Sequence, residues 1–193
     1  MYYSAIGAFS LILHLIINRS GLKKPDPSDQ RRKVDARLAS RYRFFLISAV
    51  LYYLSDIAWG ILYEHHDIPG LFPIIYSDTV FYFIFMLLTM LCWMRYVVAY
   101  LDKGRRRGKA LLYAVWAMLT AGLLSLMVNR FHPLIFSFNE NHEYIAESGR
   151  YIVFILQIAL YMVTSTYMIY IAYRSRGQER VRYAAVGFTC LAL

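Results

Sequence analysis

Two aspartates, Asp56 and Asp78, lie inside long uncharged stretches, where an ionisable side chain is costly and is by default a candidate for function. Asp56 lies about seven residues before the end of its stretch and Asp78 about seven residues after the start of the next, so both should lie about 10 Å deep in adjacent helices. Gln157, in a later stretch, falls at the same depth, with Trp59 and Tyr76 close to that level. We expect these five residues to form a polar layer that binds a small molecule from outside.

Two other interpretations of this polar layer stay open. Its carboxylates could hydrogen-bond to neighbouring helices and hold a helix bundle together, or they could pass protons or ions. The spacing alone does not separate the three. In each of them Asp56, Asp78 and Gln157 face the bundle interior, because a carboxylate turned toward lipid costs about 2.5 kcal/mol or more.

A loop between 130 and 150 carries aromatic residues on both sides of a polar turn. Residues 135–138 and 143–145 are mostly apolar and flank the polar run 139–142, which is the pattern of a short hairpin. We expect Phe136, Phe138 and Tyr144 to fold over the outer mouth of the bundle as a lid, since aromatic side chains exposed together usually have a partner.

The remaining candidates for chemistry are weak. Residues 64–67 (Glu-His-His-Asp) offer metal-type ligands, but adjacent histidines in a loop seldom both reach one ion, so we predict a solvated loop and no metal site. The sequence has no Gly-rich phosphate loop, nucleophile elbow or His-Glu-x-x-His motif. We therefore predict no catalytic residue, no cofactor and no enzymatic activity in these 193 residues.

The elements that must position the polar layer follow from composition. Apolar residues make up 59% of the chain and aromatic residues 17%, more than one soluble core needs. Crossing the hydrocarbon takes about 20 mostly apolar residues. The chain contains five such stretches and a sixth that is cut off: about 2–18, 44–63, 71–101, 110–128, 151–173 and 183–193. We predict an all-α, polytopic transmembrane bundle with five complete spans and a truncated sixth.

The basic residues predict the orientation of this bundle. Eighteen of the 21 Lys and Arg fall in 19–43, 102–109 and 174–182, whereas the alternate loops are nearly free of them. Because basic loops stay in the cytoplasm, we predict that the N-terminus lies outside. The same pattern accounts for the net charge of +9 without nucleic acid as a partner. Membrane lipid is the expected partner, with anionic lipid attracted to the basic side.

Several segments resemble the multi-pass sensor region that begins clostridial signalling proteins. They are YYSAIG (2–7), LHLIIN (13–18), LSDIAWG (54–60), YSDT (76–79), WMRYVVAYL (93–101), FSFNENHEY (136–144) and ERVRYAAVG (179–187). The outer loop departs from the family's Asp-x-Asn-Gly turn, because His142 stands in place of the glycine. The resemblance implies that residues 1–193 are a membrane sensor domain whose cytoplasmic output domain, a GGDEF diguanylate cyclase or a histidine kinase, is missing from the chain.

The resemblance therefore implies a membrane-embedded sensory input module of a bacterial signalling protein in the cell (inner) membrane, with homodimerisation through the output domain. The alternatives are a small multi-pass transporter and a membrane anchor that senses nothing. A transporter needs a site near the midplane with access from both faces, often at broken helices, whereas this polar layer is off-centre and only Pro73 interrupts a stretch. Those features favour the sensor.

Overall fold

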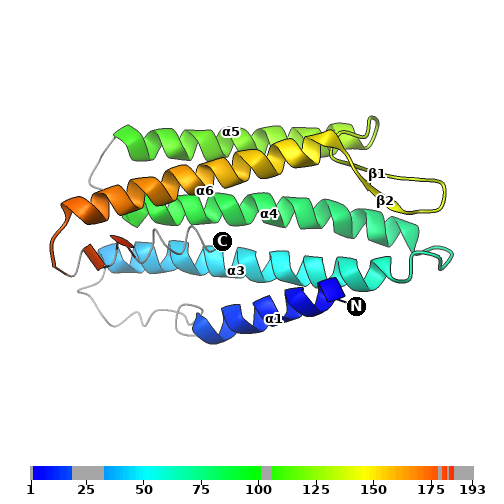
Figure 1. Cartoon of the computed structure of the whole chain (residues 1–193), viewed down its shortest axis with the longest axis horizontal. Coiled ribbons are helices and arrows are strands. Elements are labelled where there is room, and N and C mark those ends of the chain that lie inside the picture. Colours follow the sequence, from blue (N-terminus) through cyan, green and yellow to red (C-terminus); the bar gives the residue numbers. More distant parts are fainter. Residues whose placement is uncertain (1, 19–32, 101–105, 178–179, 182, 185–193) are drawn as a thin grey trace. The chain divides into compact units, whose positions relative to one another are not determined.

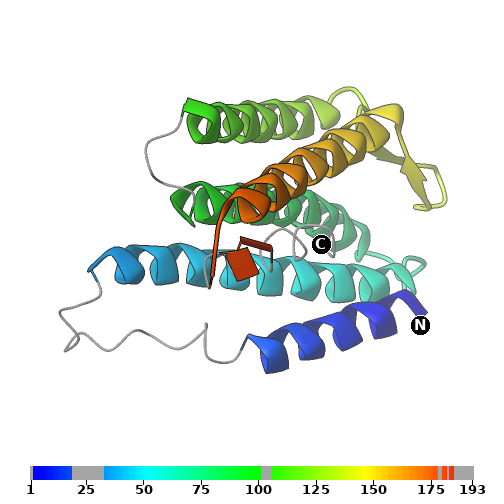
Figure 2. The same cartoon turned by 60° about the vertical axis from the view of Figure 1, so that its left-hand side comes forward.

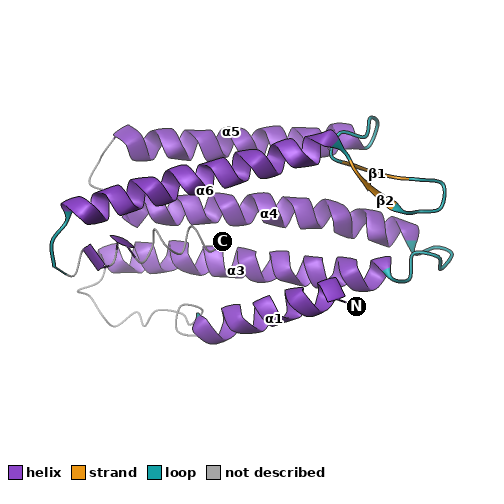
Figure 3. Cartoon of the chain, in the orientation of Figure 1, coloured by secondary structure: helices purple, strands orange, loops and turns teal. Residues whose placement is uncertain are grey.

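The computed structural model describes residues 2–18, 33–100, 106–177, 180–181 and 183–184. The elements, in chain order, are α1 (Tyr2–Ile17), α3 (Lys33–Tyr63), α4 (Phe72–Tyr100), α5 (Arg106–Asn129), β1 (Phe136–Phe138), β2 (Tyr144–Ala146) and α6 (Ser148–Arg174). Figure 3 shows that the described chain is helical apart from its loops and one hairpin, as the all-α prediction requires. The chain divides into two compact units, Met1–Ala146 and Glu147–Leu193.

In the first unit, α1 packs on α3, α3 on α4, and α4 on α5 (Figures 1 and 2). Each helix runs antiparallel to the one before it. Tyr42, near the start of α3, donates to the Asn18 side-chain oxygen, just past the end of α1, at 2.5 Å. Arg41 donates to the backbone oxygen of Arg95, near the end of α4, at 3.2 Å. The helix ends that border the two basic segments, 19–43 and 102–109, therefore lie together at one end of this unit.

The prediction of five complete spans is corrected by the length of α1. Within the described residues, four helices are long and apolar enough to cross a membrane: Arg37–Tyr63, Phe72–Ala99, Gly108–Asn129 and Ser148–Arg174. The first stretch forms a helix of only 16 residues. At 1.5 Å per residue that is about 24 Å, short of the roughly 30 Å of hydrocarbon. The truncated sixth span, 183–193, lies almost wholly outside the described residues.

The four long helices carry the surface expected of membrane spans. Large apolar side chains remain exposed along them, for example Phe44 at 63% and Met127 at 69%. Such surfaces are unfavourable in water but suit contact with hydrocarbon. α3 begins at Lys33, well before the predicted apolar stretch at 44, because the basic segment that leads into the span is itself helical. Pro73 lies in the first turn of α4, where its missing N–H costs nothing.

The predicted hairpin is present in the loop after α5. β1 pairs with β2 in antiparallel register, with Phe136 opposite Ala146 and Phe138 opposite Tyr144. Asn139 organises the turn, because its side-chain oxygen accepts the backbone N–H of Asn141 at 3.0 Å and of Glu143 at 2.8 Å. His142 takes the left-handed conformation, with φ of 61°, and its N–H donates to the backbone oxygen of Asn139 at 3.0 Å. The tight turn therefore forms with histidine in the position that usually favours glycine.

The second unit contains α6, which runs for 27 residues, from Ser148 to Arg174. Glu147 precedes it in extended conformation and makes no side-chain cap. At the other end, Ser175 closes the helix by donating its backbone N–H to the oxygen of Ala172 at 3.2 Å. Arg174 in the last turn suits the negative end of the helix dipole.

Candidate functional site

The centre of the candidate site is a polar contact between α3 and α4. Ser55 donates its hydroxyl to Asp78 Oδ1 at 3.1 Å. Ser55 precedes Asp56 in the chain, so this bond places the two aspartates at one level of the neighbouring helices. Ser55 itself is only 4% exposed, so the bond lies inside the packed interface of the helices.

A second polar contact joins the same two helices one turn away. Trp59 donates its indole N–H to the Thr79 hydroxyl oxygen at 3.1 Å, and Thr79 donates its own hydroxyl to the backbone oxygen of Ile75 at 2.8 Å. On the other side of the aspartates, the hydroxyls of Tyr52 and Tyr82 lie 3.2 Å apart. The polar layer of α3 and α4 therefore continues on both sides of Ser55 and Asp78.

One carboxylate oxygen in this layer has no hydrogen-bond partner among the described residues. Asp78 Oδ2 is buried, and no described residue forms a hydrogen bond with it. A buried acceptor without a donor costs about 1–3 kcal/mol, and more if it is charged. The hydrogen bonding of Asp78 is thus complete only when a donor reaches Oδ2.

Asp56 lies beside Gly7 of α1. A Cβ placed on Gly7 of α1 would lie 2.9 Å from Asp56 Oδ2 and 3.1 Å from Ile57 Cγ1. Both distances are too short for ordinary contacts, so the missing side chain of Gly7 is what permits this approach. Further along α1, the His14 ring packs 5.8 Å from Tyr53 and 6.5 Å from Phe45, which is a packing role.

Aromatic rings extend from the polar layer toward the hairpin along α3. Trp59 stacks on Tyr63 with ring centroids 4.8 Å apart, and Tyr63 stacks on His66 at 5.2 Å. Tyr144 of β2 meets the Trp59 ring edge-on at 5.5 Å, and its backbone N–H donates to the Tyr63 hydroxyl oxygen at 3.1 Å. Trp59 therefore touches both Thr79 of the polar layer and Tyr144 of the hairpin.

The start of α4 meets the other strand of the hairpin. Tyr76 lies 5.4 Å from Phe136 between ring centroids and 6.2 Å from Phe138. Phe136 also stacks on Phe83 at 5.8 Å and is 1% exposed. Phe72 meets Phe138 edge-on at 5.3 Å. All three residues predicted to form a lid thus contact α3 or α4, although whether the hairpin opens and closes stays a prediction.

Asn129, which the sequence analysis passed over, holds this hairpin in place. Its side-chain oxygen accepts the backbone N–H groups of Leu134, Ile135 and Phe136 at 2.8, 2.7 and 3.3 Å. Its side-chain nitrogen donates to the backbone oxygen of Phe136 at 2.9 Å. The residue is 6% exposed. A signal was available: an amide at the end of an apolar helix, followed closely by Pro133, marks a chain reversal whose backbone groups need partners.

Of the five predicted ligand-binding residues, Asp56 and Trp59 lie on α3, and Tyr76 and Asp78 lie on the neighbouring α4. Trp59 and Tyr76 also contact the hairpin, and binding of a ligand by these residues stays a prediction. Gln157 belongs to α6 in the second unit, so its grouping with the aspartates stays a prediction.

The His65 and His66 rings each lie 2.9 Å from a backbone oxygen of their own helix end. Among the described residues, no three His, Cys, Asp or Glu side chains lie together as a metal site would need.

This arrangement suits recognition of a ligand that carries positive charge or several hydrogen-bond donors. Ionised carboxylates only accept hydrogen bonds, and the faces of Trp and Tyr rings attract cations.

No protein-family model, curated protein or solved structure matches the chain. The resemblance to clostridial sensor regions therefore remains a prediction.

Proposed function

We propose that the chain is the membrane-embedded sensory input module of a bacterial signalling protein. In this proposal it lies in the inner membrane with its N-terminus and hairpin outside, and α1 packs along α3 without crossing the full thickness of the hydrocarbon. A small cationic ligand binds from outside at Asp56 and Asp78, and the response passes to a diguanylate cyclase or histidine kinase output that dimerises in the cytoplasm.

The observation that carries the proposal is the unpartnered Asp78 Oδ2 in a layer that aromatic residues connect to the hairpin. A purely structural aspartate would be expected to have donors for both oxygens, because an unsatisfied buried acceptor lowers stability. A ligand with an N–H group or a positive charge would supply the missing donor. The direct contact of Trp59 with both Thr79 and Tyr144 gives such a ligand a route to displace the hairpin.

The continuity of the helices favours a sensor over a transporter. α3 and α4 run unbroken past the polar layer, through 31 and 29 residues. Transporters commonly bind their substrates where helices are interrupted near the midplane. A sensor requires only that its ligand prefer one of two helix arrangements. The close approach of Gly7 to Asp56 makes the α1–α3 contact responsive to what Asp56 binds.

The grouping of basic helix ends supports the orientation. Arg41 near the start of α3 and Arg95 near the end of α4 lie in contact at the end that borders the basic segments, whereas the hairpin contacts Tyr63 and Phe72 at the other helix ends. Since basic segments are retained in the cytoplasm, the hairpin end is placed outside in our proposal.

Ligand binding can be tested on the purified chain with an Asp78→Asn variant and a set of free amino acids, polyamines and quaternary amines. A ligand at a hundred times its Kd adds about 2.7 kcal/mol, which should raise the Tm by about 5 °C or more. We expect one of these compounds to do so for the wild type and not for Asp78→Asn. Glu140→Gln is the matched control, because it removes an exposed acid from the hairpin turn.

If no compound raises the wild-type Tm while Asp78→Asn alone lowers it by several degrees, the layer is structural and the proposal fails. The output can be tested separately by sequencing the encoding DNA beyond the Leu193 codon. A GGDEF or kinase domain in frame would support a signalling role, and a transport-type repeat of further spans would contradict it.

A further inference from the structure

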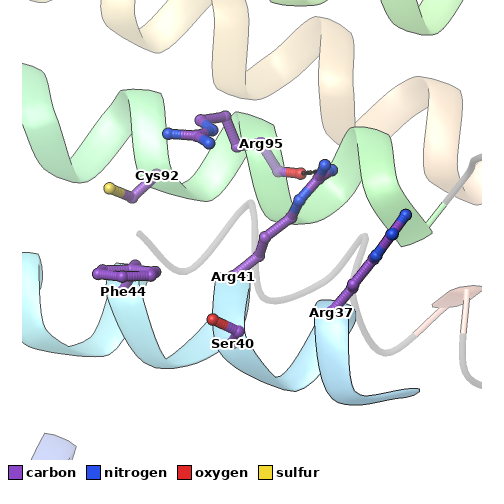
Figure 4. Close-up of a pocket in the computed structure, with 6 residues that line it drawn as sticks. All are labelled: Arg37, Ser40, Arg41, Phe44, Cys92 and Arg95. Atoms are coloured by element: carbon purple, nitrogen blue, oxygen red, sulfur yellow. Dashed lines mark hydrogen bonds between the residues drawn. The ribbon is translucent and has the colours of Figure 1, made fainter. Parts of the chain in front are cut away.

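A second polar site lies between α3 and α4 at the end of the first unit opposite the hairpin. A cavity of about 390 Å³ opens there, lined by Arg37, Ser40, Arg41, Phe44, Cys92 and Arg95 (Figure 4). That volume is in the range of small-ligand pockets. Three of these six described lining residues are arginines and none is acidic.

Helix geometry explains why these residues line one cavity. Arg37 and Arg41 are four residues apart on α3, so they share one face with Phe44, and Cys92 and Arg95 are three residues apart on α4. Arg41 spans the gap by donating to the backbone oxygen of Arg95 at 3.2 Å. Figure 4 shows Arg37 and Arg41 rising from α3 toward α4, with Arg95 and Cys92 on the α4 side. The Arg41 guanidinium is thereby held against α4 beside the cavity.

Among the described residues that line the cavity, none carries a negative charge to offset the arginines. Like charges four residues apart on a helix, such as Arg37 and Arg41, destabilise it by a few tenths of a kcal/mol. Arginine, with its planar array of donors, matches phosphate oxygens two at a time. The Ser40 hydroxyl and the aromatic face of Phe44 complete a wall that is polar on one side and apolar on the other.

The depth of the site points to the same ligand chemistry. The apolar span of α3 begins at Arg37 and that of α4 ends at Ala99. The cavity therefore lies at the first turns of the α3 span and near the last turns of the α4 span. Phosphate groups of a bilayer lie at this level, beside the ends of the hydrocarbon. We propose that this cavity binds a phosphate group, presented either by the headgroup of an anionic phospholipid or by a soluble phosphate-bearing anion. The proposal is independent of ligand binding at Asp56 and Asp78.

Cys92 provides a direct probe of the cavity. The chain has two cysteines, so a Cys190→Ser variant leaves Cys92 as the only thiol. The measurement is the rate of maleimide labelling of Cys92 in nanodiscs under three conditions. The nanodiscs contain phosphatidylcholine alone, phosphatidylcholine mixed with phosphatidylglycerol, or phosphatidylcholine alone with millimolar inorganic phosphate in the buffer. Lys109→Cys, in a chain whose two native cysteines are replaced by Ser, is the reference thiol, because Lys109 is exposed and does not line the cavity.

We expect phosphatidylglycerol to slow labelling of Cys92 several-fold more than labelling of the reference thiol. The phosphatidylglycerol fraction that halves the labelling rate should be about fivefold higher in Arg41→Gln or Arg95→Gln than in the parent chain. About fivefold is the factor that one arginine near an anionic surface contributes. Lys109→Gln should leave it unchanged. Arg95→Lys, which keeps the charge but loses the planar fork, should give an intermediate value and guards against a folding artefact.

The source of the phosphate follows from the remaining arms. Protection by phosphatidylglycerol alone identifies a lipid headgroup, whereas protection by inorganic phosphate in phosphatidylcholine identifies a soluble anion. Equal labelling of Cys92 in all three conditions would overturn the proposal. So would protection that survives Arg41→Gln and Arg95→Gln, or a Cys92 that never reacts, since the cavity would then be closed to the interface.

Discussion

Replacing Asn129 with Ala should release the hairpin from the helices. The substitution removes four hydrogen bonds of 2.7–3.3 Å and leaves three backbone N–H groups and one backbone oxygen near a buried position without their partner. At about 0.5–1.5 kcal/mol for each bond, the loss is about 2–6 kcal/mol. Because these bonds lie within 129–136, the cost should fall on the loop and hairpin and leave the helices folded.

Hydrogen–deuterium exchange of peptides covering 134–146 measures this cost locally. A loss of about 3 kcal/mol corresponds to exchange about a hundredfold faster, with little change in peptides from α3 and α4. Asn141→Ala is the matched control, because Asn141 is an exposed residue of the hairpin turn that bonds to Asn139 through its backbone N–H, which the substitution keeps. Exchange that is unchanged in Asn129→Ala, or equally fast in both variants, would refute the role assigned to Asn129.

Two further substitutions test the backbone positions that permit close approach. His142 has a φ of 61° and stacks on Phe72 at 4.4 Å, so His142→Gly loses the ring contact but relieves the backbone, whereas His142→Ala only loses the contact. We expect His142→Gly to leave the hairpin about 1 kcal/mol more stable than His142→Ala does, measured by exchange of the same peptides. Gly7→Val should separate α1 from Asp56 and lower the free energy of unfolding by about 1–3 kcal/mol. Ala5→Val, at an exposed position of the same helix, is its control in thermal unfolding, and equal effects of the two changes would contradict the close approach.

The long spans could be predicted because hydrophobic length is a property of sequence alone. Asp56 and Asp78 could also be assigned to one level, since each lies about seven residues from the end of its stretch that faces the hairpin, and the bond from Ser55 to Asp78 agrees with that. The ability of the first stretch, 2–18, to cross the membrane is overestimated from the sequence. Its 17 uncharged residues are close to the limit for a span, and a count of apolar residues does not show where a helix begins and ends.

The details that build the site depend on contacts distant in sequence. The sequence shows that Gly7 is small, but not that Asp56 lies opposite it. It shows an amide at 129, but the three N–H groups that this amide accepts become visible only when the chain reverses. The gathering of Arg37, Arg41 and Arg95 around one cavity was likewise hidden, because as a sequence feature they contribute only to the charge that predicts orientation.

The proposed site is open to an external ligand only if the hairpin lies outside the cell, and labelling of single cysteines in intact cells tests this most directly. In a chain with Cys92→Ser and Cys190→Ser, we expect an impermeant maleimide to label Asn141→Cys at once. Arg106→Cys, at the start of α5, should react only after the membrane is permeabilised. Labelling of position 106 and protection of position 141 in intact cells would contradict the orientation and the ligand site built on it.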